Sequence, residues 1–192
     1  MFFENLRCDL KCLTATGDLS LRVFIRGLLS QGFQAILVYR FFRWFYERGI
    51  PAQPLRFFFE RFIEMTTGIS IPVECEIAKG LRIHHFGGII VHPAARIGEY
   101  CTLYHQVTIG DKGGWGGAAT IGNHTLIGAG AKIIGDIHIG DYCTIGANAV
   151  ITKDIPSYCT AVGNPFKIKH LKQKPTDKLT QKLEADENFH NG

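Results

Sequence analysis

Two neighbouring histidines, His84 and His85, precede the glycine pair Gly87-Gly88 near the middle of the chain. An imidazole titrates near pH ~6.5, so at physiological pH its neutral form can take a proton from a hydroxyl group, which contributes about 10²–10⁴-fold to a rate. A histidine is more often structural than catalytic, and the glycines indicate a tight turn. The pair is a candidate for proton transfer. Whether it is catalytic or structural depends on the fold of the surrounding chain.

The other histidines of the central region differ in their setting. His105, which precedes Gln106, and His92 could approach the same place, whereas His124 and His138 occupy positions that we expect to face solvent. We keep His105 as a candidate contact to a substrate.

A six-residue repeat of branched aliphatic residues runs through the segment that holds these histidines. A period of six suits neither a helix nor a simple strand, but it suits a parallel β-coil in which each short strand sends one large side chain inward. Glycine often follows the aliphatic residue, where a corner favours a residue without Cβ, and small residues stand two positions before it. The pattern predicts a hexapeptide-repeat solenoid over residues 69–168. Its repeating residues are Ile71, Ile77, Ile83, Ile89, Val91, Ile97, Leu103, Ile109, Ile121, Ile127, Ile133, Ile139, Ile145 and Ile151.

The repeat is interrupted twice. Its phase slips by two residues between Ile89 and Val91, just after the histidine pair, and residues 110–120 form a glycine-rich loop without the pattern. Interruptions of a rigid repeat are common places for binding and catalytic sites. We therefore expect chemistry at both.

The residues before the solenoid, 1–68, are predicted to form a short helical region. We expect a helix over 21–48, broken near Gly32, and a second helix over 54–67. Arginines interrupt their aromatic residues, so no apolar run reaches the ~18–20 residues of a membrane span. These helices either cap the end of the solenoid, which we favour, or contact a membrane surface.

The amino-acid composition of the chain narrows the classes of function that the protein can have. The 192 residues include 21 basic and 17 acidic ones, an excess too small to indicate a nucleic-acid partner. The six cysteines form no Cys-x-x-Cys pair, and several occupy the small inward position of the repeat, so we expect them to pack in the core. With no signal peptide at the start, we expect a cytoplasmic protein, at most peripheral at the inner face of the membrane. Residues 169–192 are predicted to be a basic and polar tail.

Several motifs together resemble the serine acetyltransferase branch of the hexapeptide acyltransferases, over about residues 30–170. The resemblance implies a left-handed parallel β-helix, so the expected fold class is mainly β with a short α-helical N-terminal domain. It also implies acetyl-CoA as donor, assembly as a homotrimer, and active sites in the clefts between subunits. The motifs are Gly32-Phe33-x-Ala35 before Tyr39-Arg40, Val107-Thr108-Ile109-Gly110, Gly128-Ala129-Gly130-Ala131-Lys132-Ile133 and Ala161-Val162-Gly163-Asn164-Pro165.

The donor side of the implied site matches this chain. Ala129 and Ala147, each just after an Ile-Gly corner, match the alanines that line the CoA arm in the family. Gly163 and nearby lysines are placed where the phosphates of CoA could be met. These lysines are Lys153, Lys167 and Lys169, and any of them could instead serve solubility alone.

The catalytic histidine of the family corresponds to His85, which precedes a Gly-Ile-Ile-Val run. In serine-specific members an Asp at the position of Ser70 pairs with that histidine, and an Asp at the position of His84 contacts the substrate amino group. Here a backbone carbonyl, Glu74 or Glu76 could orient the base instead.

The glycine loop departs from the family as well. Serine-specific members carry an Arg-His pair that grips the serine carboxylate, and this chain has Gly117 and Ala118 in those places. The zinc site of the γ-class carbonic anhydrases, which share the hexapeptide fold, is not matched by His105 and His124, so we predict no metal.

These features predict an acetyl-CoA-dependent O-acetyltransferase with an uncharged acceptor hydroxyl, such as a sugar of a surface polysaccharide or its precursor. His85 would be the general base, and His84, Ser70 and His105 would lie near the acceptor. Two alternatives stay open. One is serine O-acetyltransferase of cysteine biosynthesis, with the missing groups supplied from elsewhere, and the other is a catalytically silent trimeric scaffold.

Overall fold

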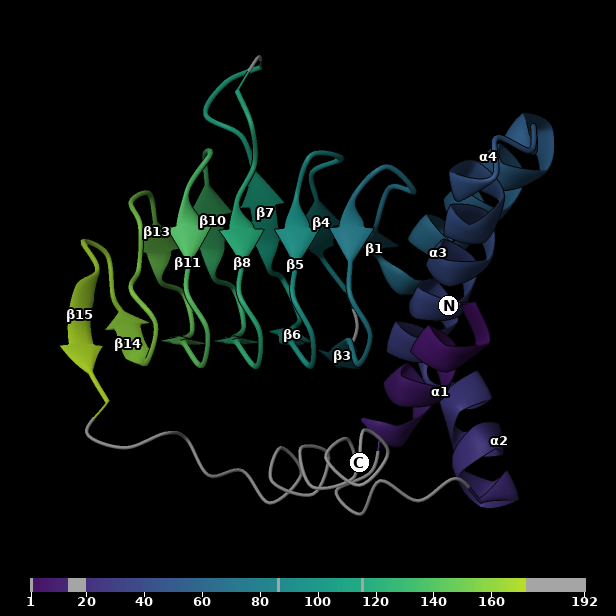
Figure 1. The fold of residues 1–192 in the computed structure, drawn as a ribbon, viewed down its shortest axis with the longest axis horizontal. Coiled ribbons are helices and arrows are strands. Elements are labelled where there is room, and N and C mark those ends of the chain that lie inside the picture. The colour runs from purple at the N-terminus through teal and green to yellow at the C-terminus, as the bar shows by residue number, and fades with distance from the viewer. Residues whose placement is uncertain (1, 14–19, 86, 115, 172–192) are drawn as a thin grey trace, which may run out of the picture.

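A parallel β-solenoid extends from a group of helices at one end of the molecule (Figure 1). The computed structural model describes residues 2–13, 20–85, 87–114 and 116–171. Each of the first four coils of the solenoid contributes a short strand to each of three sheets. The helices are α1 (Phe2–Lys11), α2 (Leu21–Leu29), α3 (Gln31–Glu47) and α4 (Gln53–Thr67).

The three sheets form the three faces of the solenoid. The five-stranded sheet contains β1 (Ile69–Ser70), β4 (Ile89–Val91), β7 (Thr108–Gly110), β10 (Lys132–Ile134) and β13 (Val150–Ile151). The four-stranded sheet contains β2 (Glu76–Ile77), β5 (Arg96–Ile97), β8 (Thr120–Ile121) and β11 (His138–Ile139). The six-stranded sheet contains β3 (Arg82–His84), β6 (Thr102–Tyr104), β9 (Leu126–Ile127), β12 (Thr144–Ile145), β14 (Cys159–Val162) and β15 (Lys167–His170), of which β15 is antiparallel.

The six-residue repeat fills the core as the sequence predicts, except that Ile71, at its start, is only partly buried. In the five-stranded sheet Val91, Ile109, Ile133 and Ile151 lie in register on successive coils, and all of them are buried. Burial of each such side chain contributes about 1.5–3 kcal/mol. The corners leave no room for larger residues, because a Cβ on Gly128 would lie 2.7 Å from the backbone nitrogen of Ala147 on the next coil.

The two interruptions of the repeat lie on different edges of the solenoid. The turn His85–Gly88 joins the six-stranded to the five-stranded sheet, and we call this corner the histidine edge, with His85, His105, Ala129 and Ala147. The glycine loop joins β7 to β8 at the opposite margin of the five-stranded sheet, and it rises from the solenoid at the top of Figure 1. We call that corner, which also carries Lys153, the loop edge.

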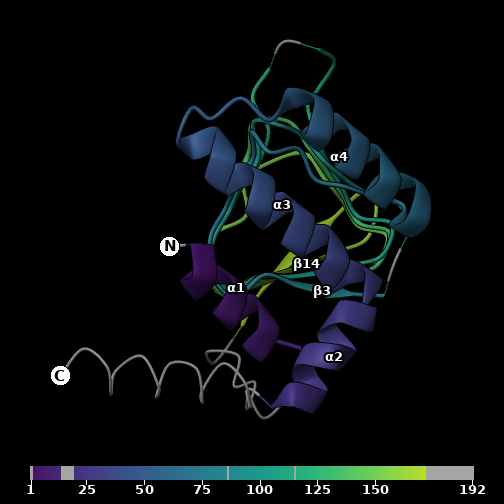
Figure 2. The same cartoon turned by 90° about the vertical axis from the view of Figure 1, so that its right-hand side faces the viewer.

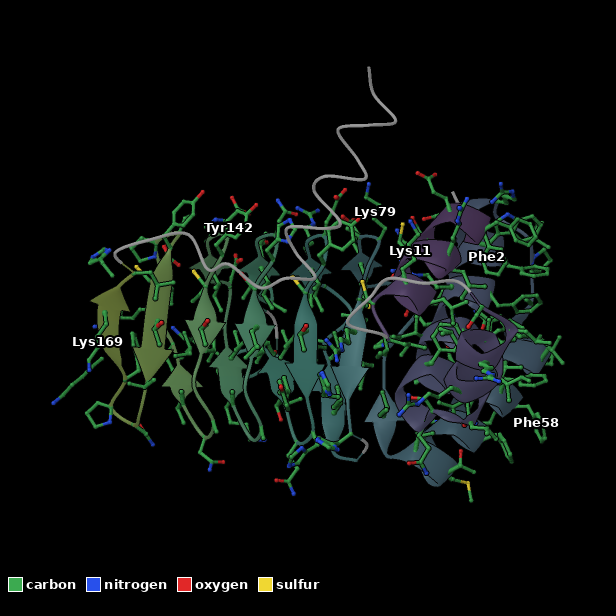
Figure 3. The ribbon with its side chains drawn as sticks, turned by 90° about the horizontal axis from the view of Figure 1, so that it is seen from below. Phe2, Lys11, Phe58, Lys79, Tyr142 and Lys169 are labelled. Atoms are coloured by element: carbon green, nitrogen blue, oxygen red, sulfur yellow. The ribbon has the colours of Figure 1, made fainter. Side chains whose placement is uncertain are left out.

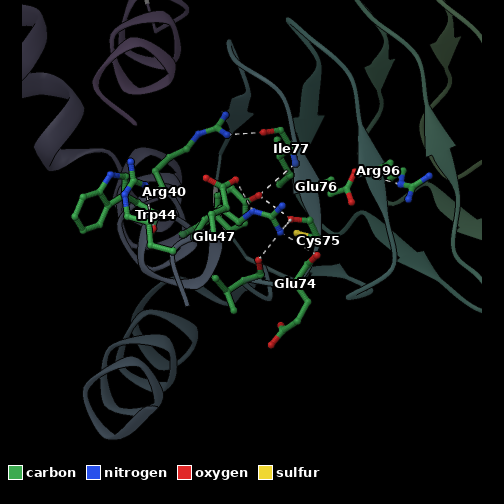
Figure 4. A network of polar contacts seen from close by, with 12 residues as sticks. Arg40, Trp44, Glu47, Glu74, Cys75, Glu76, Ile77 and Arg96 are labelled. Atoms are coloured by element: carbon green, nitrogen blue, oxygen red, sulfur yellow. Dashed lines mark hydrogen bonds and ion pairs between the residues drawn. The ribbon is translucent and has the colours of Figure 1, made fainter. Parts of the chain in front are cut away.

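The helices form a cap over the first coil. Helix α3 crosses the open end of the solenoid, with α1 and α4 on either side of it (Figure 2). Its polar side chains donate to carbonyls of the first coil: the Tyr39 hydroxyl donates to Cys75 O at 2.8 Å and the Arg43 guanidinium donates to Val73 O at 3.0 Å. Figure 4 shows Arg40 of the same helix reaching Ile77. The cap therefore closes the edge at which the sheets would otherwise be unpaired.

A buried ion pair fixes α1 to the rest of the cap. Arg40 Nε donates to Asp9 Oδ2 at 2.9 Å, and Leu81 N donates to Asp9 Oδ1 at 2.8 Å. The same guanidinium donates to Ile77 O and Ala78 O, both at 2.5 Å. Burial raises the pKa of Asp9, and the charge of Arg40 opposes that rise.

The helical region differs from the sequence prediction in one respect. Helix α1 was not predicted, since only scattered leucines mark residues 1–20. The predicted break in the long helix is confirmed and lies at Ser30, two residues before Gly32. Gly32 lies inside α3 and packs on the solenoid, because a Cβ there would be 2.8 Å from Ile83 Cβ. Helix α4 agrees with the prediction within one residue, and residues 172–192 of the predicted tail lie outside the described residues.

Candidate active site on the histidine edge

His85 begins the turn that interrupts the repeat. Its φ of 63° is left-handed. The left-handed position that recurs on the next coil is that of Gly88 (69°), whose counterpart there is Gln106 (58°). The His85 side chain is exposed, and its ring centroid lies 5.6 Å from that of His105 in an edge-on contact. The structure thus brings together two of the predicted site residues, with the candidate base open to a substrate.

His84, on β3, stacks on Tyr104 of the neighbouring strand β6. Their ring centroids are 4.9 Å apart and the rings are nearly parallel, at 13°. Burial lowers the pKa of His84, and the nearby charges of Arg82 and His85 lower it further. His84 is therefore neutral at physiological pH and does not supply the negative charge with which a carboxylate would pair with an ammonium group.

The donor-binding candidates line the same edge as His85. Backbone hydrogen bonds connect successive corners: Gln106 N donates to Gly87 O at 2.9 Å, Gly130 N to His105 O at 2.9 Å, and Asn148 N to Ala129 O at 2.8 Å. Ala129 and Ala147 consequently follow His85 and His105 along one straight edge. Such a row of small residues leaves an open track for a narrow ligand arm beside the candidate base.

The remaining donor-side candidates are divided between two places. Gly163 ends β14 with a φ of 90°, and Lys167 and Lys169 lie exposed on β15 at the end of the solenoid far from the cap (Figure 3). Lys153 lies on the loop edge, next to Thr152, whose carbonyl accepts a hydrogen bond from Lys112 at 3.3 Å. Within one chain Lys153 is therefore separated from the other candidates by the five-stranded sheet.

A carboxylate that the sequence prediction missed stands beside Ser70. The Ser70 hydroxyl donates to Glu64 Oε1 of helix α4, and Glu64 Oε2 pairs with Arg61 Nη2 at 2.5 Å. Helix α4 ends against the turn after His85, because Ile89 N donates to Gly68 O at 3.1 Å and a Cβ on Gly68 would lie 3.1 Å from Gly87 Cα. No sequence signal connects Glu64 with Ser70 other than the end of the helix between them.

The two carboxylates proposed from sequence to orient His85 are engaged elsewhere. Glu74 pairs with Arg56 at 3.1 Å, and Glu76 pairs with Arg96 at 3.2 Å on the four-stranded sheet. Glu76 also lines a cavity of about 570 Å³ between α3 and that sheet, away from the histidine edge. Neither residue is placed to orient the base within the chain.

The late part of the glycine loop lacks the charged side chains that serine-specific members carry there. A Cβ on Gly117 would lie 2.9 Å from Cγ of the exposed Asp136 side chain, which can move aside, whereas Ala118 is 4% exposed. Of the two positions, Ala118 is therefore the one enclosed by its surroundings.

The cysteines behave as core residues, as the sequence predicts. Burial raises the pKa values of Cys75 and Cys101 to about 12, so both stay protonated and unreactive. The described residues contain no group of three or more His, Cys, Asp or Glu side chains placed to hold a metal ion.

Residues 118–153 match the family model "Bacterial transferase hexapeptide (six repeats)". The serine acetyltransferase of Synechococcus elongatus is 35% identical over 169 residues, which are 86% of this chain and 68% of the relative. The chain belongs to the serine acetyltransferase family. A serine acetyltransferase of Neisseria gonorrhoeae solved in complex with serine has the same fold, with a TM-score of 0.77 and 29% identity over 86% of this chain and 68% of that one. Another serine acetyltransferase, solved in complex with CoA, gives a TM-score of 0.76 and 28% identity over 88% of this chain and 69% of that one.

Family membership settles the coarse chemistry. The solenoid is the left-handed parallel β-helix of the serine acetyltransferases, and the protein is an acyltransferase that uses acetyl-CoA as its donor. The prediction of fold and of reaction class is confirmed. A glycan acceptor finds no support in these relatives.

Proposed function

We propose that this protein acetylates the hydroxyl of L-serine. The observation that carries the proposal is the family match over most of the chain, combined with the charged pair Arg61 and Glu64 beside Ser70. A serine acceptor needs one partner for its carboxylate and one for its ammonium group. The loop and His84 lack these charges, whereas helix α4 carries one of each sign, with Glu64 in contact with Ser70.

In the proposed mechanism the neutral imidazole of His85 takes the proton of the acceptor hydroxyl as its oxygen attacks the thioester carbonyl. Collapse of the tetrahedral species expels the CoA sulfur, which receives the proton back from the imidazolium. No covalent enzyme intermediate is needed. Neutral His84 beside the base adds no positive charge, so it does not oppose protonation of His85 during the step.

We further propose that the working unit is a homotrimer. The histidine edge and the loop edge lie at opposite margins of the five-stranded sheet, so one chain alone leaves the glycine loop and Lys153 far from His85. The outer face of this sheet carries Ile90, which is 54% exposed. Packing of that face on a neighbour would bring the loop edge of one copy to the histidine edge of another. A mass in solution of about 64 kDa, three times the 21.4 kDa chain, is expected, and a monomer would contradict the arrangement.

A second candidate acceptor is an uncharged hydroxyl, such as that of a sugar. The observation in its favour is the absence of the serine-gripping charges: Gly117 and Ala118 carry none, and His84 is stacked on Tyr104. A stacked aromatic pair beside the base suits a sugar ring better than an amino acid.

Release of CoA from acetyl-CoA separates the two acceptors. We expect L-serine at millimolar concentration to stimulate release well above the rate of hydrolysis, and neutral sugars to give no such increase. If only sugars stimulate the release of CoA, the acceptor is a sugar and not serine. If no acceptor stimulates it, a catalytically silent scaffold is favoured.

The charged pair gives a finer test of serine recognition. Arg61→Gln should raise the KM for L-serine about tenfold and leave the KM for acetyl-CoA unchanged, since one charged hydrogen bond is lost. Arg96→Gln, which removes an arginine paired on the four-stranded sheet, is the matched control and should change neither value. An unchanged KM for L-serine in Arg61→Gln would remove Arg61 from the acceptor site.

A further inference from the structure

Large apolar side chains gather on the outer surface of the helical cap. On the described part of the solenoid the large apolar side chains that are exposed are Ile90, Tyr158, Val162 and Ile168, whereas the cap exposes many more. We call the outer sides of α2 and α4 the apolar cap face. It consists of Leu21, Phe24, Ile25, Leu28, Leu29, Leu55, Phe57, Phe58, Phe62 and Met65.

Helix α4 has two apolar sides, one packed on the protein and one exposed, so its exposed residues are not simply part of the core. The inner side of α4 packs on the protein: Ile63 and Thr67 are buried, and the ring centroids of Phe59 and Phe42 are 6.0 Å apart. A second stripe, Leu55, Phe58, Phe62 and Met65, follows the helical spacing on the outside, and these side chains are 53–86% exposed. Phe58 lies at the cap end of the molecule, opposite the end that carries Lys169 (Figure 3). An apolar stripe of this size on a soluble surface marks an interaction site.

The charge of the cap indicates which partner covers the face. Residues 21–67 contain seven arginines and three glutamates, a balance of +4, while the rest of the chain has 14 basic and 14 acidic residues and balances to zero. The three glutamates are paired: Glu47 with Arg43, Glu60 with Arg56 and Glu64 with Arg61, at 2.5–3.6 Å. Of the four other arginines Arg40 is buried against Asp9, so the excess positive charge at the surface of this segment rests on Arg22, Arg26 and Arg48.

Two arginines of α2 supply charge where the apolar side chains are densest. Arg22 and Arg26 are exposed, and neither pairs with an acidic residue in the described part of the chain. A second copy docked through this face would bring like charges together, whereas an anionic lipid surface is complementary to both the charge and the apolar side chains.

The helices are suited to lie on a bilayer rather than to cross it. Among the described residues no single helix is long and apolar enough to span a membrane. Only α2 and α3 together have the length and composition, and they are bent by 91° to each other.

We propose that the apolar cap face binds the surface of an anionic lipid bilayer. The phenylalanines of α4 and the apolar residues of α2 enter the boundary between headgroups and acyl chains, and Arg22 and Arg26 contact the phosphates. The solenoid then projects away from the membrane, as its long axis in Figure 1 requires. Because α4 ends at the turn after His85, the site lies in the coils nearest the lipid. The proposal does not depend on which acceptor is used.

Vesicle flotation of the full-length protein tests the proposal. We expect the protein to float with vesicles that contain 30 mol % phosphatidylglycerol at low salt, and to bind vesicles of phosphatidylcholine alone at least about tenfold more weakly. The double variant Phe58→Gln/Phe62→Gln should lose at least about tenfold of the binding. The double variant Arg22→Gln/Arg26→Gln should bind anionic vesicles about tenfold more weakly, with no change for vesicles of phosphatidylcholine alone. Its remaining binding should depend less on salt.

Two controls make the result decisive. Ile168→Gln replaces an exposed apolar residue at the far end of the solenoid, and Arg96→Gln replaces an exposed arginine of the four-stranded sheet, so both should float like the wild type. Absence of wild-type binding to anionic vesicles, or equal binding by both double variants and the wild type, would overturn the proposal. So would a drop in the mass of the assembly in Phe58→Gln/Phe62→Gln without lipid, because the face would then be a contact between protein copies.

Discussion

The solenoid and the helical cap are stabilised in different ways. In the solenoid each coil repeats the same inward aliphatic residues and the same backbone bonds, so stability is spread over many equivalent contacts. The cap is held to the first coil by apolar side chains such as Ile36 and Ile63, which join the same core. It is also held by a few polar contacts that occur only once, chiefly those of Asp9, Tyr39, Arg40 and Arg43. The proposed active site lies where the two regions meet, which would make its geometry sensitive to both.

The largest effect on stability should follow from breaking the polar contacts of the cap. Asp9→Ala leaves Arg40 buried without its partner, which typically costs about 3–5 kcal/mol. Because the described helices all lie in the cap, the helical circular dichroism signal should be lost at a lower urea concentration than the signal of the β-solenoid. Glu76→Ala, which breaks the exposed pair with Arg96, should cost less than about 1 kcal/mol. Equal losses in the two variants would show that the buried pair does not hold the cap.

A substitution at a corner of the solenoid should have an intermediate effect. In Gly128→Ala the new Cβ would lie 2.7 Å from Ala147 N, so the next coil must shift, at a cost of about 1–3 kcal/mol. Gly116→Ala, in the open loop where a Cβ meets nothing within 4 Å, is the control and should cost under about 1 kcal/mol. Urea unfolding measures both, and a neutral Gly128→Ala would mean that the coils are not packed as tightly as described.

The smallest effect concerns pH at the junction of cap and solenoid. Since burial lowers the pKa of His84, the unfolded chain binds a proton before the folded one does as the pH falls below ~6.5. The stability associated with neutral His84 is present above that pH and is lost as the pH falls through the folded-state value. His84→Phe keeps a ring on Tyr104 without titrating, so its melting temperature should fall less between pH 8 and pH 5.

The contribution should be below about 0.5 kcal/mol, because the residue is only partly buried and solvent screens it. If the melting temperatures of the wild type and His84→Phe fall equally between pH 8 and pH 5, His84 does not titrate as described.

The sequence predicts the solenoid well because its period is local and strict. Each aliphatic residue and each corner glycine carries the same information, and a slip of the repeat locates the turn at His85 directly. The cap is predicted less well, since helix α1 depends on the tertiary contact of Asp9 with Arg40, more than thirty residues apart.

The site was predictable only in part for a related reason. The row from His85 to Ala147 follows from the repeat, because equivalent corners stack. The contact of Glu64 with Ser70 depends on how α4 docks, and the separation of Lys153 from His85 depends on which corner each residue occupies. Neither is visible in a linear pattern.

The measurement that tests the central claim most directly is the rate of acetyl transfer by His85→Asn. Asparagine tolerates the left-handed backbone at this corner, so the turn should be retained. With acetyl-CoA and L-serine we expect kcat to fall about 10²–10⁴-fold with the KM for acetyl-CoA unchanged, while His138→Asn, an exposed histidine on β11, keeps the wild-type rate. A wild-type kcat in His85→Asn would contradict the assignment of His85 as the base, and with it the placing of the active site on the histidine edge.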